Sequence, residues 1–142
     1  MSNLDKIVII ARLSKLSEAA KYLKDLQKLN QKSFLNDYHN FLSAERGLQL
    51  CIEAILDVGR ILISKLDFRR PYENQDIITT LAENKVITGE LHDKLIGMAR
   101  FRNILVHEYA EIDRKVIYQN LQTRLQDFEE FKKQITKYLR CL

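Results

Sequence analysis

A single proline, Pro71, interrupts a chain of 142 residues in which apolar side chains recur every three to four positions. That spacing places apolar side chains on one face of an α-helix. Proline and glycine are the residues that destabilise a helix interior most strongly, and the chain has only four glycines. Sustained alternation of apolar and polar residues, the pattern of a half-buried strand, does not appear. The sequence therefore predicts an all-α fold.

The periodicity delimits four long helices and one short one. Their approximate ranges are 3–30, 33–66, 75–84, 88–110 and 113–142. Side chains that can cap the following helices are those of Ser2 or Asn3, Thr88 and Asp113. Gly47 and Gly59 lie inside the second range. They either cost about 1 kcal/mol each relative to alanine or mark the close approach of a neighbouring helix.

The length fits one domain, residues 1–142, arranged as an up-and-down helical bundle. A hydrophobic fraction of 46% and a charged fraction of 30% argue against a disordered chain. The net charge of +4 permits a polyanionic partner without requiring one.

Two sequence features bear on compartment and metal binding. Cys51 and Cys141 form no CxxC motif, so the spacing favours neither a zinc site nor a disulfide framework. The apolar run 7–11 is too short for a signal peptide or a membrane span. We therefore expect a reduced cytoplasmic protein without a membrane partner.

The segment RFRNILVHEY, residues 100–109, crowds polar side chains into an otherwise amphipathic helix. His107 titrates near neutral pH, so it can take the proton of a ribose 2′-hydroxyl or protonate a leaving 5′-oxygen. Arg102 is permanently charged and can stabilise the charge of a pentacoordinate phosphate. This chemistry requires no metal. The two residues together therefore form a candidate site for RNA cleavage.

The spacing of this pair leaves other interpretations open. Five positions correspond to about 140° of rotation on a helix. The two side chains therefore converge only if the helix ends near His107 or if two copies meet across a dimer axis. Alone, His107 could contact the last helical carbonyls, and Arg102 could form a surface ion pair.

The segment resembles the Rx4HxY signature of the HepT family within the HEPN superfamily. Arg102, His107 and Tyr109 match the motif, and Asn103 matches the polar residue that often follows the arginine. The resemblance extends in the same order over residues 43–64, 72–88 and 101–121.

The resemblance implies a HEPN bundle that forms a homodimer, in which two motif copies line one cleft. It further implies a metal-independent endoribonuclease that acts as the toxin of a type VII-like toxin–antitoxin pair. The implied partner is a minimal nucleotidyltransferase (MNT) antitoxin, which would transfer AMP from ATP onto Tyr109. The added phosphate would repel RNA and occupy Arg102. This chain itself would need no cofactor, because the partner uses the ATP.

Supporting roles are expected for Asn103 and Asp57. Asn103 could instead be a hydrogen-bonding residue of the last helical turn. Asp57 could orient His107 or pair with Arg102, or it could form a purely structural ion pair. Tyr109 could alternatively be an aromatic residue at the rim of a dimer interface.

Two other functions compete with the nuclease. The bundle could be a non-catalytic partner of a nucleotidyltransferase, with a cleft that binds nucleotide or substrate and cuts no RNA. It could also be a purely structural helical dimer, but that interpretation leaves the polar cluster unexplained.

Overall fold

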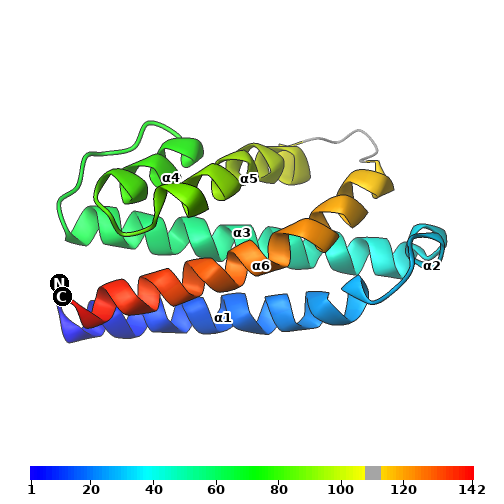
Figure 1. Ribbon diagram of the computed structural model, residues 1–142, viewed down its shortest axis with the longest axis horizontal. Helices are drawn as coiled ribbons and strands as arrows, with labels where there is room; N and C mark the ends of the chain where they lie inside the picture. The colour runs from blue at the N-terminus through cyan, green and yellow to red at the C-terminus, as the bar shows by residue number, and fades with distance from the viewer. Residues whose placement is uncertain (108–112) are drawn as a thin grey trace.

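The computed structural model describes the backbone of residues 1–107 and 113–142 and the side chains of residues 1–105 and 113–142. All regular secondary structure in this part of the chain is α-helical, which confirms the predicted class (Figure 1). The helices are α1 (Asn3–Gln27), α2 (Gln31–Asn36), α3 (Tyr38–Lys65), α4 (Asn74–Glu83), α5 (Gly89–His107) and α6 (Arg114–Arg140). None of these described helices is long and apolar enough to cross a membrane.

The four long helices are confirmed, but two short helices are present where the sequence predicts one. The additional helix is α2, which apolar periodicity merges with α3. Asp37 separates them because its backbone is extended (φ −116°, ψ 112°). Its side chain accepts a hydrogen bond of 2.9 Å from the backbone N–H of His39. A polar cap therefore interrupts a pattern that the apolar spacing alone would continue.

The long helices alternate in direction along the chain, as expected for an up-and-down bundle (Figure 1). The central helix is α3, which packs against α1, α4, α5 and α6. Both termini lie at one end of the molecule, opposite α2 (Figure 1). The largest fully buried side chains are Phe34, Phe128, Phe131, Ile9, Leu16, Leu23, Leu48, Ile52, Ile55, Leu56, Leu62 and Ile78. Burying each of them stabilises the bundle by about 1.5–3 kcal/mol.

The three predicted N-caps are confirmed. The Ser2 side chain accepts a hydrogen bond from the backbone N–H of Asp5, and the Asp5 carboxylate accepts one from the backbone N–H of Ser2. Thr88 Oγ1 accepts from the backbone of Leu91 at 3.1 Å, and the Asp113 side chain caps α6. These side chains satisfy backbone N–H groups that a helix leaves unpaired at its start.

Gly47 and Gly59 mark places where neighbouring helices approach α3 closely. A Cβ atom on Gly47 would lie 2.5 Å from Leu23 Cδ2, and one on Gly59 would overlap Ile77 Cγ2. Ile77 is only 2% exposed, and its Cγ2 is attached directly to its stiff Cβ, so it cannot move aside easily. The second of the two interpretations of these glycines, close helix approach, is therefore confirmed.

We expect Gly59→Ala to lower the free energy of unfolding by about 1–2 kcal/mol, because the overlap with Ile77 outweighs the gain in helix propensity. Gly97→Ala is the matched control inside α5. Its Cβ would meet only Arg124 Nη2, at 3.6 Å. That variant should raise the free energy of unfolding by about 0.5–1 kcal/mol. Urea denaturation measures both changes, and two changes of the same sign would contradict this packing.

The connection between α3 and α4 contains Pro71, and Arg69 joins it to α4 through hydrogen bonds. The Arg69 guanidinium donates to both carboxylate oxygens of Asp76, at 2.7 and 2.9 Å, and to both of Glu83, at 3.2 Å. The hydrogen bond from Arg69 holds the pKa of Asp76 below its ordinary value. Arg69 is thus ion-paired and does not belong to a freely solvated basic patch.

Candidate active site

Arg102 and Asn103, the first residues of the polar motif, lie in the last turns of α5, which the core holds in place. Phe101 and Leu105 are buried, at 7% and 8% exposure. Arg102 lies at the edge of this buried face, and Asn103 is exposed. The alternation of buried and partly exposed positions follows from the helical period. Arg102 therefore lies at the surface of the bundle, while the buried side chains of Phe101 and Leu105 hold the backbone of α5 in place.

Arg102 is held by a carboxylate from another helix. Its Nε donates a hydrogen bond of 2.6 Å to Oε1 of Glu53 in α3. The two side chains keep only 21% and 30% of their surface exposed. A short, partly desolvated, charge-assisted hydrogen bond is stronger than an exposed ion pair. Arg102 is thus a fixed group at the junction of α3 and α5.

Asp57 lies one turn from Glu53 on α3 but contacts a different arginine. Its Oδ1 accepts a hydrogen bond of 3.0 Å from Arg60 Nη1, and Arg60 Nη2 donates to Asn74 Oδ1 at 2.8 Å. Asp57 is therefore not the carboxylate that pairs with Arg102, contrary to one sequence expectation. The structure contains an ion pair between Asp57 and Arg60, the alternative expectation, whereas the expected contact of Asp57 with His107 lies outside the described side chains. The spacing of four between Glu53 and Asp57 explains the mistake, because both carboxylates lie on the same helix face.

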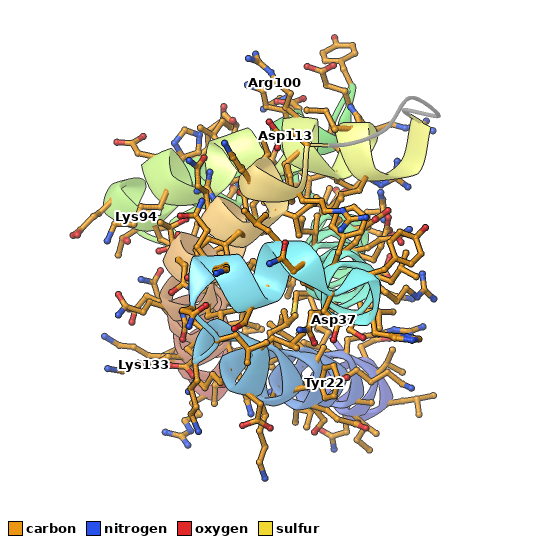
Figure 2. The ribbon with its side chains drawn as sticks, turned by 90° about the vertical axis from the view of Figure 1, so that its right-hand side faces the viewer. Tyr22, Asp37, Lys94, Arg100, Asp113 and Lys133 are labelled. Carbon is orange, nitrogen blue, oxygen red and sulfur yellow. The ribbon has the colours of Figure 1, made fainter. Side chains whose placement is uncertain are left out.

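Glu53 is absent from the residues predicted from the sequence. Its one available signal is the spacing from Asp57, and spacing alone cannot select the carboxylate that faces α5. Arg100, which also precedes the motif, is exposed and projects from the edge of the bundle (Figure 2).

The remaining predicted site residues lie at and beyond the end of α5. The backbone of His107 is helical, and its side chain lies outside the described side chains. Tyr109 lies outside the described residues altogether. Arg102 and His107 therefore lie five positions apart on one helix, and the direction of the His107 side chain lies outside the described residues.

α6, the helix that follows the motif in the chain, starts at a residue that contacts α2 and α3. Arg114, the first residue of α6, donates a hydrogen bond of 2.9 Å to the carbonyl oxygen of Leu35. Its guanidinium lies 5.3 Å from the ring centroids of both Tyr38 and Phe41. These cation–π contacts fix the start of α6 against α2 and α3.

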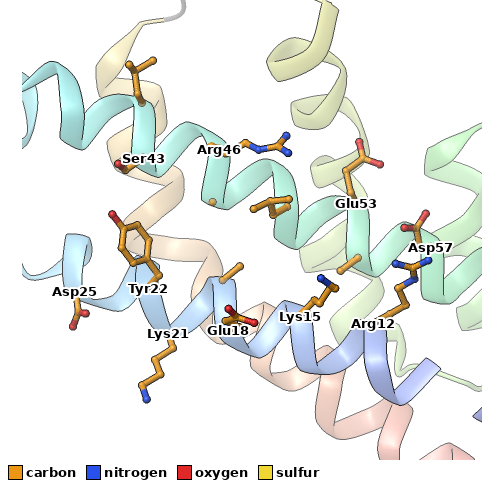
Figure 3. Close-up of a pocket in the computed structure, with 15 residues that line it drawn as sticks. Arg12, Lys15, Glu18, Lys21, Tyr22, Asp25, Ser43, Arg46, Glu53 and Asp57 are labelled. Atoms are coloured by element: carbon orange, nitrogen blue, oxygen red, sulfur yellow. The ribbon is translucent and has the colours of Figure 1, made fainter. Parts of the chain in front are cut away.

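A groove of about 910 Å³ between α1 and α3 extends to the Arg102 site. Glu53 is the link, since it lines the groove and contacts Arg102. Tyr22 and Ser43 lie at one end of the groove, and Arg12 and Asp57 lie at the other (Figure 3). Side chains of both charge signs line the groove. They are Arg12, Lys15, Glu18, Lys21, Asp25, Arg46, Glu53 and Asp57.

Two titratable residues of α3, Cys51 and Glu45, have shifted pKa values but make no contact that assigns them to the site. Burial raises the pKa of the Cys51 thiol to about 12, so this residue is an inert part of the core. Partial burial also raises the pKa of Glu45. Neither residue forms a hydrogen bond to Arg102 in the described part of the chain.

Comparison with known families and curated proteins gives a consistent result. The sequence matches the family described as ribonuclease HepT-like over residues 16–135. It is 29% identical over 139 residues to the tRNA nuclease HepT of Aphanizomenon flos-aquae, covering 98% of this chain and 95% of that protein. It is 31% identical over 121 residues to the mRNA nuclease HepT of Shewanella oneidensis, covering 84% and 91%.

A solved structure supports the same relationship. The fold is similar to the tri-AMPylated HEPN toxin of Shewanella oneidensis, solved in complex with an MNT antitoxin, with a TM-score of 0.83. The two chains are 28% identical, and the similarity covers 96% of this chain and 99% of that one. The resemblance noted in the motif therefore extends to the whole fold.

Proposed function

Because the chain belongs to the ribonuclease HepT-like family, we propose that it is an RNA-cleaving toxin of a toxin–antitoxin pair. The relatives described as tRNA and mRNA nucleases support RNA as the substrate class. The related toxin solved with an MNT antitoxin supports a nucleotidyltransferase as the partner. Within this chain, the observation that carries the proposal is the partly buried, positioned guanidinium of Arg102 on the helix that includes His107.

Cleavage would follow general acid–base chemistry on a phosphodiester. His107 accepts the proton of a ribose 2′-hydroxyl, and the 2′-oxygen forms a bond to phosphorus. The bond from phosphorus to the 5′-oxygen breaks, and this oxygen takes the proton from protonated His107. Arg102 stabilises the negative charge on the phosphate oxygens in the transition state. The products are a 2′,3′-cyclic phosphate and a 5′-hydroxyl, and no metal ion takes part in the sequence of steps.

The site would be completed by a second copy of the chain. A homodimer would bring two Arg102–His107 pairs into one cleft. Exposed apolar side chains on α1 and α3 support such a contact, among them Ile7, Leu42 and Leu50 at 61%, 42% and 45% exposure. Asn103, exposed beside Arg102, would contribute a hydrogen bond to the bound RNA. A sedimentation mass equal to one chain would contradict the dimer.

Control would operate through Tyr109. The phenol oxygen attacks the α-phosphate of ATP held by the antitoxin, an O–P bond forms, and pyrophosphate leaves. The resulting phosphodiester places negative charge two residues from His107. That charge competes with RNA for Arg102 and repels the RNA backbone. Both partners would work in the cytoplasm, where ATP and the RNA substrates are.

Growth of bacteria in which the chain is induced tests this proposal. We expect induction to stop growth, and co-expression of the cognate nucleotidyltransferase to restore it. A catalytically inactive nucleotidyltransferase that still binds should restore growth poorly. Growth that is unaffected by the induced, soluble chain would instead favour the non-catalytic binding partner.

A further inference from the structure

Glu53 and Arg102 form the one contact in which a described motif side chain is held from outside its own helix. The distance between Arg102 Nε and Glu53 Oε1 is 2.6 Å, and the pair connects residues 49 positions apart in the chain. Both side chains are more than two-thirds buried. This contact is specific to one carboxylate, because Asp57 on the next turn of α3 is occupied by Arg60.

The atom that Glu53 uses determines what Arg102 can still do. A guanidinium has five N–H donors in one plane. Glu53 accepts a hydrogen bond from Nε. The terminal Nη1 and Nη2 groups make no hydrogen bond to another residue in the described part of the chain. Because the guanidinium is rigid and planar, fixing Nε also fixes the plane of the terminal donors. Those donors are then oriented before a phosphate arrives, which lowers the cost of reaching the transition state.

We propose that Glu53 is the positioning residue for Arg102 in RNA cleavage. Glu53 does not touch the substrate; it sets the plane of the guanidinium that binds the scissile phosphate. The inference rests on the proposed function and adds a third residue, from α3, to the pair in α5.

Removal of the Glu53 charge should affect substrate binding and turnover differently. The carboxylate is negative and lies beside a phosphate-binding group, so removing its charge cannot weaken the electrostatic attraction of RNA. Glu53→Gln should therefore leave KM unchanged or lower it. The same change should reduce kcat by about ten- to a hundredfold, because Arg102 loses its orientation. A residue that only stabilises the fold would not separate kcat from KM in this way.

Glu83→Gln is the matched control, since it makes the same substitution on α4 and removes a carboxylate that pairs with a different arginine, Arg69. Its kcat should stay within about threefold of the wild type, a range typical of exposed ion pairs. The second control is the double variant Glu53→Gln, Arg102→Ala. If Glu53 acts through Arg102, the double variant should be no slower than Arg102→Ala alone.

The experiment compares these variants with single-turnover and steady-state kinetics on purified RNA. The Nε–H resonance of Arg102, observed by NMR, provides a readout that does not depend on activity. It should shift in Glu53→Gln and stay unchanged in Glu83→Gln. A Glu53→Gln chain as active as the wild type, or a full further loss in the Arg102→Ala background, would overturn the positioning role alone. A wild-type chain that cuts no RNA would remove the proposed function, and this inference with it.

Discussion

His107→Ala is expected to lower the rate of RNA cleavage by about a hundredfold to ten-thousandfold. The reason is that the proposed mechanism uses the His107 imidazole to take the proton of the 2′-hydroxyl, and an alanine side chain cannot accept a proton. The measurement is the single-turnover rate on a labelled RNA, with the unfolding midpoint recorded in parallel. In cells, the same change should abolish growth arrest.

Arg102→Ala should have a comparable effect, by about a hundred- to a thousandfold, since it removes the charge that stabilises the transition state. Arg100→Ala is the matched control. Arg100 is an exposed arginine on the same helix, two residues earlier, and carries the same charge. Its loss should change the rate by no more than about threefold, the size of an exposed electrostatic effect. Equal losses in Arg100→Ala and Arg102→Ala would mean that only overall charge matters.

Tyr109→Phe is expected to remove every adenylyl group from the chain after co-expression with its nucleotidyltransferase. Phenylalanine keeps the ring but lacks the oxygen that forms the bond to phosphorus. Intact mass spectrometry measures the outcome directly. The wild type should carry one or more adenylyl groups and cut no RNA, whereas the variant should remain unmodified and active.

Tyr72→Phe supplies the comparison for this variant. Tyr72 is 95% exposed, so simple accessibility would make it the better target. If modification depends on position in the motif, Tyr72→Phe should be modified as fully as the wild type. Adenylyl groups that persist in Tyr109→Phe would assign the modification to another residue and remove the proposed means of control.

The helices and their starts could be predicted from the sequence because the determinants are local. Apolar period, caps such as Thr88 and Asp113, and the scarcity of proline all act within one or two turns. The separation of α2 from α3 was missed for a physical reason. Apolar side chains recur on both sides of Asp37, so the extended backbone of one residue decides whether one helix or two form.

The residues of the candidate site also differ in whether the sequence alone reveals them. Arg102 could be singled out from the sequence because the residues of the motif lie close together in the chain. Glu53 could not, because its contact with Arg102 depends on how α3 packs against α5, 49 residues away. Gly59 shows the same limit, since only the position of Ile77 on α4 distinguishes close packing from a tolerated glycine. Spacing thus predicts which side chains share a face, and packing selects the pair that meets.

In the proposed reaction, this chain cuts RNA by attack of the 2′-hydroxyl. His107 transfers the protons, and Arg102 stabilises the charge on the phosphate. The most direct measurement is the chemistry of the new RNA ends, produced by the purified, unmodified chain in the presence of a metal chelator. We expect 2′,3′-cyclic phosphate and 5′-hydroxyl ends that are absent with His107→Ala. Intact RNA, or 3′-hydroxyl and 5′-phosphate ends that His107→Ala leaves unchanged, would contradict it.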